Sequence, residues 1–192
     1  MFFLGLLDTL RLLEPARDFY NRLRYVLNIR IRRDNAEYVL RGAPDGLPIP
    51  TPKLMYLVSG NCHLEDLFIN GRQGAECIRR ILGKNGIPME KLGSILDFGC
   101  GCGRVVRFWA GLKDTKVFGT DYNPELVAWC RDNLKFGEFG VNALTGRLDY
   151  PDNRFDFVYA ISVFTHLPQE MQKPWLDELV RVTAPGGYLY IT

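Results

Sequence analysis

Three glycines at alternate positions are the feature of this sequence whose spacing points most directly to ligand binding. Gly99, Gly101 and Gly103 follow the apolar run 95–98 and precede a second apolar run at 105–109. A strand that leads into a glycine-rich turn and a helix brings backbone N–H groups close to a ligand, because glycine has no side chain to hold the ligand away. The sequence therefore predicts a turn that cradles a ligand through its main chain.

The spacing of these glycines indicates which class of ligand the turn could bind. The dinucleotide fingerprint G-x-G-x-x-G fails, because the sixth position is Arg104 when counted from Gly99 and Val106 when counted from Gly101. The pattern present is D-x-G-x-G-x-G, which begins at Asp97 on the expected strand. A nicotinamide-dependent oxidoreductase is therefore the disfavoured alternative.

A second acid lies at the distance expected for a nucleotide site. Asp121 closes the apolar run 116–121, twenty positions after Gly101. In a β-turn-α-β unit, an acid at this separation meets the ribose hydroxyls of a nucleotide that lies on the first turn. An exposed loop aspartate is the alternative, and the surrounding pattern disfavours it.

Short apolar runs alternate with helical patterns along this part of the chain. Strands are expected at 95–98, 116–121, 139–141, 155–161 and 188–192, and helices at 71–85, 104–112, 124–134 and 169–182. The last helix is expected to bury Leu176, Leu179 and Val180, whereas 54–58 fits either a strand or a helical turn. The alternation predicts an α/β fold, a doubly wound and mostly parallel sheet with helices on both faces.

Three segments together resemble class I S-adenosylmethionine (SAM) dependent methyltransferases, over about residues 93–192. The D-x-G-x-G-x-G turn resembles their first motif. The segment 148–158 is similar to L-P-F-x-D-x-x-F-D-x-V, with Asp149 where proline is usual, and 181–191 is similar to R-V-x-x-P-G-G-x-L-x-I. The resemblance implies a Rossmann-like fold, SAM as cofactor and S-adenosylhomocysteine as product.

The resemblance also implies roles for individual residues. The backbone of 99–103 would approach the methionine part of SAM, Asp97 would meet its ammonium directly or through water, and Asp121 would hold the ribose. Tyr122 would flank adenine, with Asn142 nearby. The full predicted set of cofactor-binding residues is Asp97, Phe98, Gly99, Cys100, Gly101, Gly103, Arg104, Asp121, Tyr122, Asn142, Ala143, Ala160 and Ile161.

The expected activity is methyl transfer to an unidentified small-molecule acceptor by in-line displacement. Because the cofactor brings the electrophile, the protein mainly aligns the reactants and a dedicated base is optional. His166 lies in a segment that resembles the loop over the methionine end of SAM, so it is a candidate general base; a helix cap or a backbone contact is the structural alternative. A SAM-binding but catalytically silent module is the competing function.

The segment before the motifs is predicted to be a separate region. Residues 1–52 are interpreted as a helical, arginine-rich arm with a proline-rich connector, and 53–192 as the methyltransferase core. Residues 2–27 predict two amphipathic helices, and 17–41 hold seven arginines against three acids. A solvated helix face is the favoured interpretation. The alternative, functional interpretation is a weak contact of residues 1–41 with a membrane surface or with an anionic substrate.

Composition narrows the remaining functional classes of protein. A net charge of +2 does not suggest nucleic-acid binding. Five cysteines without disulfide-framework spacing predict reduced thiols in a cytoplasmic protein, and with only His63 and His166 as histidines no metal site is expected. No signal peptide and no membrane-spanning run is expected.

The resemblance also makes a prediction about the fifth strand. The family normally adds a helix and two antiparallel strands after it, so the sheet is expected to be truncated, with 188–192 as an exposed edge. Either the chain is a fragment or another chain, as in an oligomer, covers that edge.

Overall fold

The computed structural model describes residues 19–20, 23 and 28–192, and the chain divides into two compact units, Met1–Leu67 and Phe68–Thr192. The two helices expected in 2–27 lie outside the described residues, apart from the helical positions 19, 20 and 23. The boundary between the units falls inside one long helix, α5 (Leu64–Lys84). The division at 52/53 stays a prediction.

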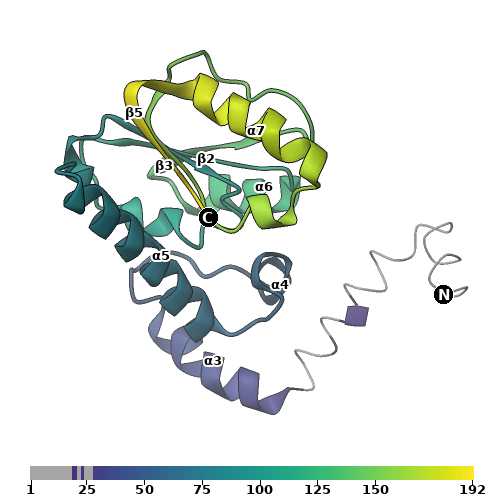
Figure 1. Cartoon of the computed structure of the whole chain (residues 1–192). Coiled ribbons are helices and arrows are strands. Elements are labelled where there is room, and N and C mark those ends of the chain that lie inside the picture. The colour runs from purple at the N-terminus through teal and green to yellow at the C-terminus, as the bar shows by residue number, and fades with distance from the viewer. Residues whose placement is uncertain (1–18, 21–22, 24–27) are drawn as a thin grey trace, which may run out of the picture. The chain divides into compact units, whose positions relative to one another are not determined.

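The second unit is built around a five-stranded parallel sheet in the order β3-β2-β1-β4-β5 (Figure 1). The strands are β1 (Ser94–Phe98), β2 (Lys116–Asp121), β3 (Gly137–Val141), β4 (Phe155–Ala160) and β5 (Thr183–Ile191). The chain first winds from β1 toward β3 and then restarts on the other side with β4. This confirms the doubly wound α/β fold and places its switch point between β1 and β4, where such sheets bind ligands.

Helices cover both faces of the sheet. On one face α7 (Gln169–Val182) packs Trp175 and Leu179 against Leu96 and Val158. On the other face Ile78 of α5 lies near Phe157 of β4. A further helix, α6 (Pro124–Asn133), begins with proline at its first turn and Asn123 as its cap. No helix in the described part of the chain is long and apolar enough to cross a bilayer.

Two shorter helices lie in the described part of the first unit. They are α3 (Ile29–Arg41), which the sequence argument did not separate from the arm, and α4 (Pro52–Ser59). The ambiguous run 54–58 is therefore helical, because Thr51 caps its start and Gly60, in the left-handed conformation, ends it.

Two predicted helix boundaries are wrong. The helix expected at 104–112 is only a short 3-10 turn, η2 (Val106–Trp109), with hydrogen bonds that span three residues. The helix expected to begin at Gly71 begins at Leu64 instead. Gly71 lies inside it because a Cβ there would stand 2.1 Å from the carbonyl oxygen of Arg104, so this glycine serves close packing and does not mark a helix end.

The predicted buried face of α7 is partly wrong. Leu179 is buried as expected, but Leu176 and Val180 are exposed. The buried stripe is Trp175, Glu178, Leu179 and Val182, which follows the i, i+3, i+4, i+7 spacing of a helix. The tryptophan anchors this stripe and turns its neighbours toward solvent.

The fifth strand lies at an edge of the sheet, as expected, and pairs only with β4 among the described strands. It begins at Thr183, before the 184–187 segment that was expected to be a turn. The pairing jumps from Phe155–Thr183 to Phe157–Tyr188, so this segment forms an irregularity within the strand. That another chain covers the edge stays a prediction.

Candidate cofactor-binding site

The glycine turn after β1 depends on positive φ angles. Gly99, Gly101 and Gly103 have φ of 80°, 55° and 79°. The N–H groups of Gly99 and Cys100 both donate to the carbonyl oxygen of Thr120, at 2.8 and 2.9 Å, which ties the turn to the end of β2. A Cβ on Gly103 would lie 2.4 Å from Leu134, so this position is also closely packed. The alternate glycines are therefore a conformational requirement of the turn.

Asp121 joins the end of β2 to this turn. Its Oδ2 accepts the N–H of Gly101 at 2.9 Å, and its Oδ1 accepts the N–H of Asn123, also at 2.9 Å. Only 7% of the residue is exposed. Burial raises the pKa of the carboxyl, and the hydrogen bonds from Asn123 and Gly101 oppose that rise. The twenty-residue spacing thus corresponds to a direct contact, while the ribose role stays a prediction.

Asp97 is buried at the end of β1, with 3% exposed. In the sheet register it lies between Gly119 of β2 and Tyr159 of β4. Burial raises the pKa of its carboxyl to about 7, while a hydrogen bond from the Tyr159 hydroxyl and the charge of Arg104 act in the opposite direction. A carboxyl of this kind changes its charge near neutral pH.

A second side chain completes this contact. Trp109 donates its indole N–H to the Tyr159 hydroxyl at 2.8 Å, and the two rings meet edge to face at 6.2 Å. Sequence reasoning missed both residues. The available signal was a tyrosine in an otherwise apolar buried strand, because a buried hydroxyl needs a partner.

Asn142 offers an acceptor next to the ribose-side acid. Its backbone N–H donates to the carbonyl oxygen of Asp121 at 3.1 Å, and its Nδ2 donates to the carbonyl oxygen of Ala143 at 2.9 Å. Its Oδ1 is buried and has no hydrogen-bond partner within the described residues. An unpaired buried acceptor here fits the exocyclic amino group of an adenine.

The other predicted residues differ in what they expose. Phe98 turns away from the turn and packs its ring 4.8 Å from Trp175, so only its backbone borders the site. Ala160 is fully buried, Arg104 and Ile161 are half-buried, and Tyr122 is exposed next to Asp121. The structure thus brings the predicted set to one rim of the sheet, with Phe98 as the side chain that faces the other layer.

The loop after β4 covers the turn. A Cβ on Gly99 would lie 2.4 Å from Val163, so this valine occupies the space directly over the turn. His166 ends a short 3-10 segment, η3 (Phe164–His166), and is exposed. Its imidazole makes no hydrogen bond to any described residue, and α7 has no side-chain cap. The general-base role of His166 stays a prediction.

The cysteines of the turn are buried thiols. Cys130 of α6 points its Sγ at the carbonyl oxygen of Gly101, at 3.4 Å. Burial raises the pKa of Cys102 to about 12, so this thiol stays protonated at neutral pH. No cluster of three potential metal ligands occurs among the described residues.

A network of ion pairs and hydrogen bonds from α7 holds the segment between β3 and β4. Sequence reasoning missed this network. Glu178 of α7 accepts the N–H of Leu148 at 2.6 Å and pairs with Arg181. Arg181 in turn bonds the carbonyl oxygen of Tyr150 at 3.0 Å and the carboxylate of Asp152 at 2.6 Å. Helix α7 therefore fixes the path of the chain into β4.

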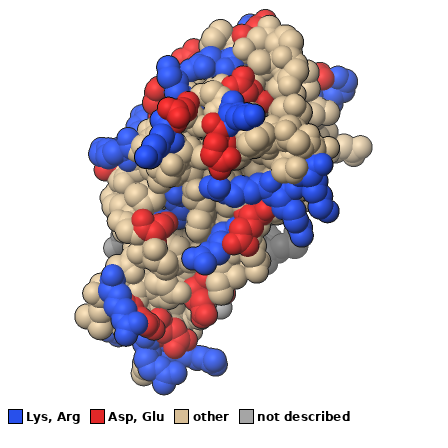
Figure 2. Space-filling view, turned by 90° about the vertical axis from the view of Figure 1, so that its left-hand side faces the viewer, with Lys and Arg blue, Asp and Glu red and all other residues tan. Residues whose placement is uncertain are grey.

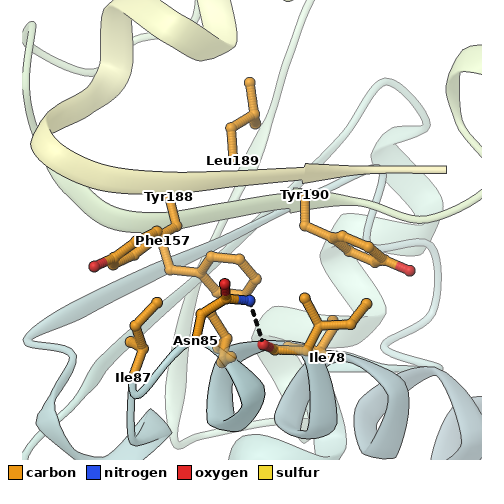
Figure 3. Close-up of a pocket in the computed structure, with 9 residues that line it drawn as sticks. Ile78, Asn85, Ile87, Phe157, Tyr188, Leu189 and Tyr190 are labelled. Carbon is orange, nitrogen blue, oxygen red and sulfur yellow. Dashed lines mark hydrogen bonds between the residues drawn. The ribbon is translucent and has the colours of Figure 1, made fainter.

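A pocket of about 400 Å³ lies elsewhere, between α5 and β5 (Figure 3). Tyr188, Tyr190 and Phe157 project into it from the sheet toward Ile78, while Asn85 bonds the carbonyl oxygen of Ile81 at 2.8 Å. The pocket shares no residue with the predicted cofactor site, so it supplies no part of that site.

The residues at the rim fit SAM. The carboxylate of Asp121 accepts backbone N–H groups, including those of Gly101 and Asn123, and its oxygens can accept further hydrogen bonds. Asp97 provides a negative charge for an ammonium, and Asn142 a free acceptor for an amino group. These three groups lie at the carboxyl ends of β1, β2 and β3, and each matches a different polar group of SAM.

Known proteins with similar sequences are methyltransferases. An uncharacterized methyltransferase of Schizosaccharomyces pombe is 33% identical over 113 residues, which is 53% of this chain and 40% of that protein. The sterol 24-C-methyltransferase of Yarrowia lipolytica is 34% identical (48% and 25% covered). The tRNA (carboxymethyluridine(34)-5-O)-methyltransferase of Arabidopsis thaliana is 36% identical (51% and 23%). The chain spans less than half the length of each of these relatives.

Solved structures share the fold. The PH0226 protein of Pyrococcus horikoshii has a TM-score of 0.51 at 26% identity. The aligned region covers 63% of this chain and 57% of the PH0226 chain. A putative SAM-dependent methyltransferase of Methanococcus maripaludis reaches 0.54 at 18% identity, with coverage of 66% and 57%, a likeness of fold alone. The model of the methyltransferase domain family matches residues 96–191, half of the chain. The chain therefore belongs to the methyltransferase domain family, among the class I SAM-dependent methyltransferases.

Proposed function

We propose that this chain binds SAM across the carboxyl ends of β1, β2 and β4 and directs its methyl group to a small-molecule acceptor. The observation that carries the proposal is the hydrogen bond between Gly101 and Asp121, at 2.9 Å. It joins the turn suited to the amino-acid tail with the acid suited to the sugar. Family membership supports the same reaction class.

Each polar group at the rim has a distinct task in this proposal. Bound SAM supplies an electrophilic methyl group on its sulfonium, and transfer breaks the carbon–sulfur bond as the acceptor's bond to carbon forms. Asp97 pairs with the ammonium of the tail, and Asp121 accepts from the ribose hydroxyls. Asn142 accepts from the amino group of adenine, which Tyr122 flanks. The protein thereby aligns the sulfur–carbon bond with the incoming acceptor.

Entry to this site requires movement of the loop after β4. Asp97 and Asp121 are buried, and Val163 lies over Gly99. The 161–168 segment therefore opens for the cofactor and closes again, which excludes water during transfer. His166 moves with this loop, so it can take the proton that the acceptor releases.

The acceptor is proposed to be a small molecule. Relatives of this chain include methyltransferases for a sterol, for tocopherol and for a tRNA, so the family itself does not decide the class of acceptor. A net charge of +2 over the chain gives little electrostatic attraction for RNA. This balance favours a small acceptor over a nucleic acid.

Two measurements test the proposal. Calorimetric titration should show binding of SAM and S-adenosylhomocysteine and no binding of NADH. Single-turnover assays with methyl-labelled SAM should then transfer label to one member of a panel that holds sterols, phenols, carboxylic acids and total tRNA. Binding without transfer to any acceptor would favour the catalytically silent module. Label in tRNA would overturn the small-molecule assignment. Absence of SAM binding would overturn the proposed cofactor site.

A further inference from the structure

Three buried side chains form a continuous chain of contacts from η2 to the end of β1. Trp109 of η2 and Tyr159 of β4 are 0% exposed, and Asp97 of β1 is 3% exposed. Trp109 Nε1 donates to the Tyr159 hydroxyl at 2.8 Å, and Tyr159 donates to the carboxyl of Asp97, its partner in the register of β1 and β4. Because these groups are closed off from solvent, they must satisfy one another.

The tryptophan sets the direction of the hydrogen bonds in this chain. An indole N–H can only donate, so the Tyr159 oxygen accepts from it and the hydroxyl proton is left to point at Asp97. Burial raises the pKa of the Tyr159 hydroxyl well above its usual value, so this proton is retained at neutral pH. A protonated Asp97 would have to donate to an oxygen that already accepts from Trp109. The chain of contacts therefore favours the ionised form of Asp97.

Arg79 of α5 closes the outer side of Trp109. Its guanidinium carbon lies 5.1 Å from the centre of the indole ring, and its Nη2 donates to the carbonyl oxygen of Phe108 at 3.2 Å. Basic and acidic side chains are interspersed on the face shown in Figure 2, and Nη1 of Arg79 lies 3.6 Å from Oε1 of Glu90. Because its charge is balanced in this way, Arg79 acts mainly by holding the indole ring in place.

Other charged and titratable groups also face the Asp97 carboxyl. Burial raises the pKa of this carboxyl, the charge of Arg104 lowers it, and the nearby Asp121 raises it further. The Cys100 thiol is neutral at physiological pH, because contact with Cys130 and burial raise its pKa. These groups lie in or beside the glycine turn, whereas the tryptophan acts from η2. A change of the indole N–H therefore leaves their contributions in place.

We propose that Trp109 is a positioning residue of the cofactor site: its indole N–H orients the Tyr159 hydroxyl, which keeps the charge of Asp97 available to the ammonium of SAM. Trp109 touches neither cofactor nor acceptor in this proposal and acts only through Tyr159. The inference rests on the proposed function, because it gives the charge of Asp97 a task at that site.

A titration of the chain without ligand tests the inference directly. NMR follows the carboxyl carbon of Asp97, which is assigned by its loss in Asp97→Asn, across the neutral pH range. Trp109→Phe should move the midpoint upward by about half a pH unit, because the Tyr159 hydroxyl is no longer oriented. The matched control Trp129→Phe, in α6, should leave the midpoint unchanged. An unmoved midpoint in Trp109→Phe would overturn the inference.

A double change tests whether Trp109 acts through Tyr159. Trp109→Phe should move the Asp97 midpoint in the wild-type chain but not in a Tyr159→Phe background, where the hydroxyl is already absent. Equal shifts in the two backgrounds would overturn the inference and leave Trp109 as a core residue only.

The wild-type chain gives a measurement that needs no substitution. The indole N–H resonance of Trp109 should shift with the same midpoint as the Asp97 carboxyl, because Tyr159 connects them, and the indole resonance of Trp129 should not. A Trp109 resonance that stays constant while Asp97 titrates would contradict the proposed coupling.

Calorimetry with S-adenosylhomocysteine separates this inference from the proposed function. Below the midpoint, Trp109→Phe should bind about threefold more weakly than wild type, and the two affinities should converge above it. An equal loss at every pH would overturn the inference, since a purely structural role predicts that result. Absence of binding by the wild-type chain would overturn the proposed function, whereas an unmoved Asp97 midpoint with normal binding would overturn the inference alone.

Discussion

The ends of β1 and β2 each carry a buried aspartate, and the two accept hydrogen bonds from different kinds of donor. Asp121 receives backbone N–H groups from Gly101 and Asn123. Asp97 depends on the side-chain hydroxyl of Tyr159, and its pKa rises to about 7. Backbone donors are fixed by the fold itself, whereas a side-chain donor exists only while one residue is kept.

The difference separates two functions at one rim. Asp121 closes the turn as well as offering an acceptor, so its loss changes the shape of the site. Asp97 contributes mainly charge, and that charge varies with pH in the neutral range.

The largest effect is expected at the turn that both acids border. Gly101→Val places a β-branched side chain at φ of 55°, a left-handed conformation that strains such a residue, so binding of S-adenosylhomocysteine should disappear in calorimetry. Gly111→Val is the matched control, since a Cβ at Gly111 meets no atom within 4 Å. Full affinity in the Gly101 variant would refute the role of the turn.

Asp121→Ala should weaken binding by ~1.5–3 kcal/mol, because it removes the ribose acceptor and leaves the Gly101 N–H unpaired. Isothermal calorimetry with S-adenosylhomocysteine measures the loss. Asp114→Ala, at an exposed aspartate, should leave the affinity unchanged. If the two variants bind alike, the turn does not need this acid.

Affinity for S-adenosylhomocysteine should depend on pH through Asp97. The ammonium of the ligand binds the ionised carboxylate of Asp97. Below a pH of about 7 this carboxyl is protonated and must lose its proton on binding, so the affinity should fall up to tenfold for each pH unit. Above that value it should level off. Methylthioadenosine, which lacks the amino-acid tail, should show a flat profile, and the Asp97→Asn variant should lose the dependence for the full ligand.

The smallest effect is expected from Tyr159→Phe. Loss of the hydroxyl removes a hydrogen bond that holds the pKa of Asp97 down, so the midpoint of the pH profile should move upward. At a pH near 7.5 the affinity should drop a few-fold and recover at higher pH. Tyr188→Phe, on the edge strand, is the control. An unchanged midpoint would show that Tyr159 only fills space.

The strands and the rim were predictable because their signals are local. The run 116–121 and the glycine pattern each specify a short element, and parallel strands bring their carboxyl ends to one edge. Side-chain partners were less accessible, because they come from elements distant in sequence. Nothing near Asp97 in the sequence points to Tyr159 or Trp109, which lie 62 and 12 positions away.

The predictions for the buried face of α7 and for the start of α5 were wrong for a related reason. Leu176 and Val180 have the hydrophobicity of core residues, but the large ring of Trp175 takes the interior position against Phe98. Gly71 signals a helix end by type, yet it lies inside α5 to admit the backbone of Arg104. Packing between layers outweighed local preference in both cases.

The sequence by itself determined the doubly wound sheet, the glycine turn and the position of both acids at its rim, because these follow from period, spacing and backbone conformation. Only the tertiary structure decided which groups donate to each acid and that Val163 covers the turn. Those outcomes depend on which side chains, distant in sequence, pack against one another. Burial and electrostatic interactions are set by that proximity in space and not by the order of residues in the chain.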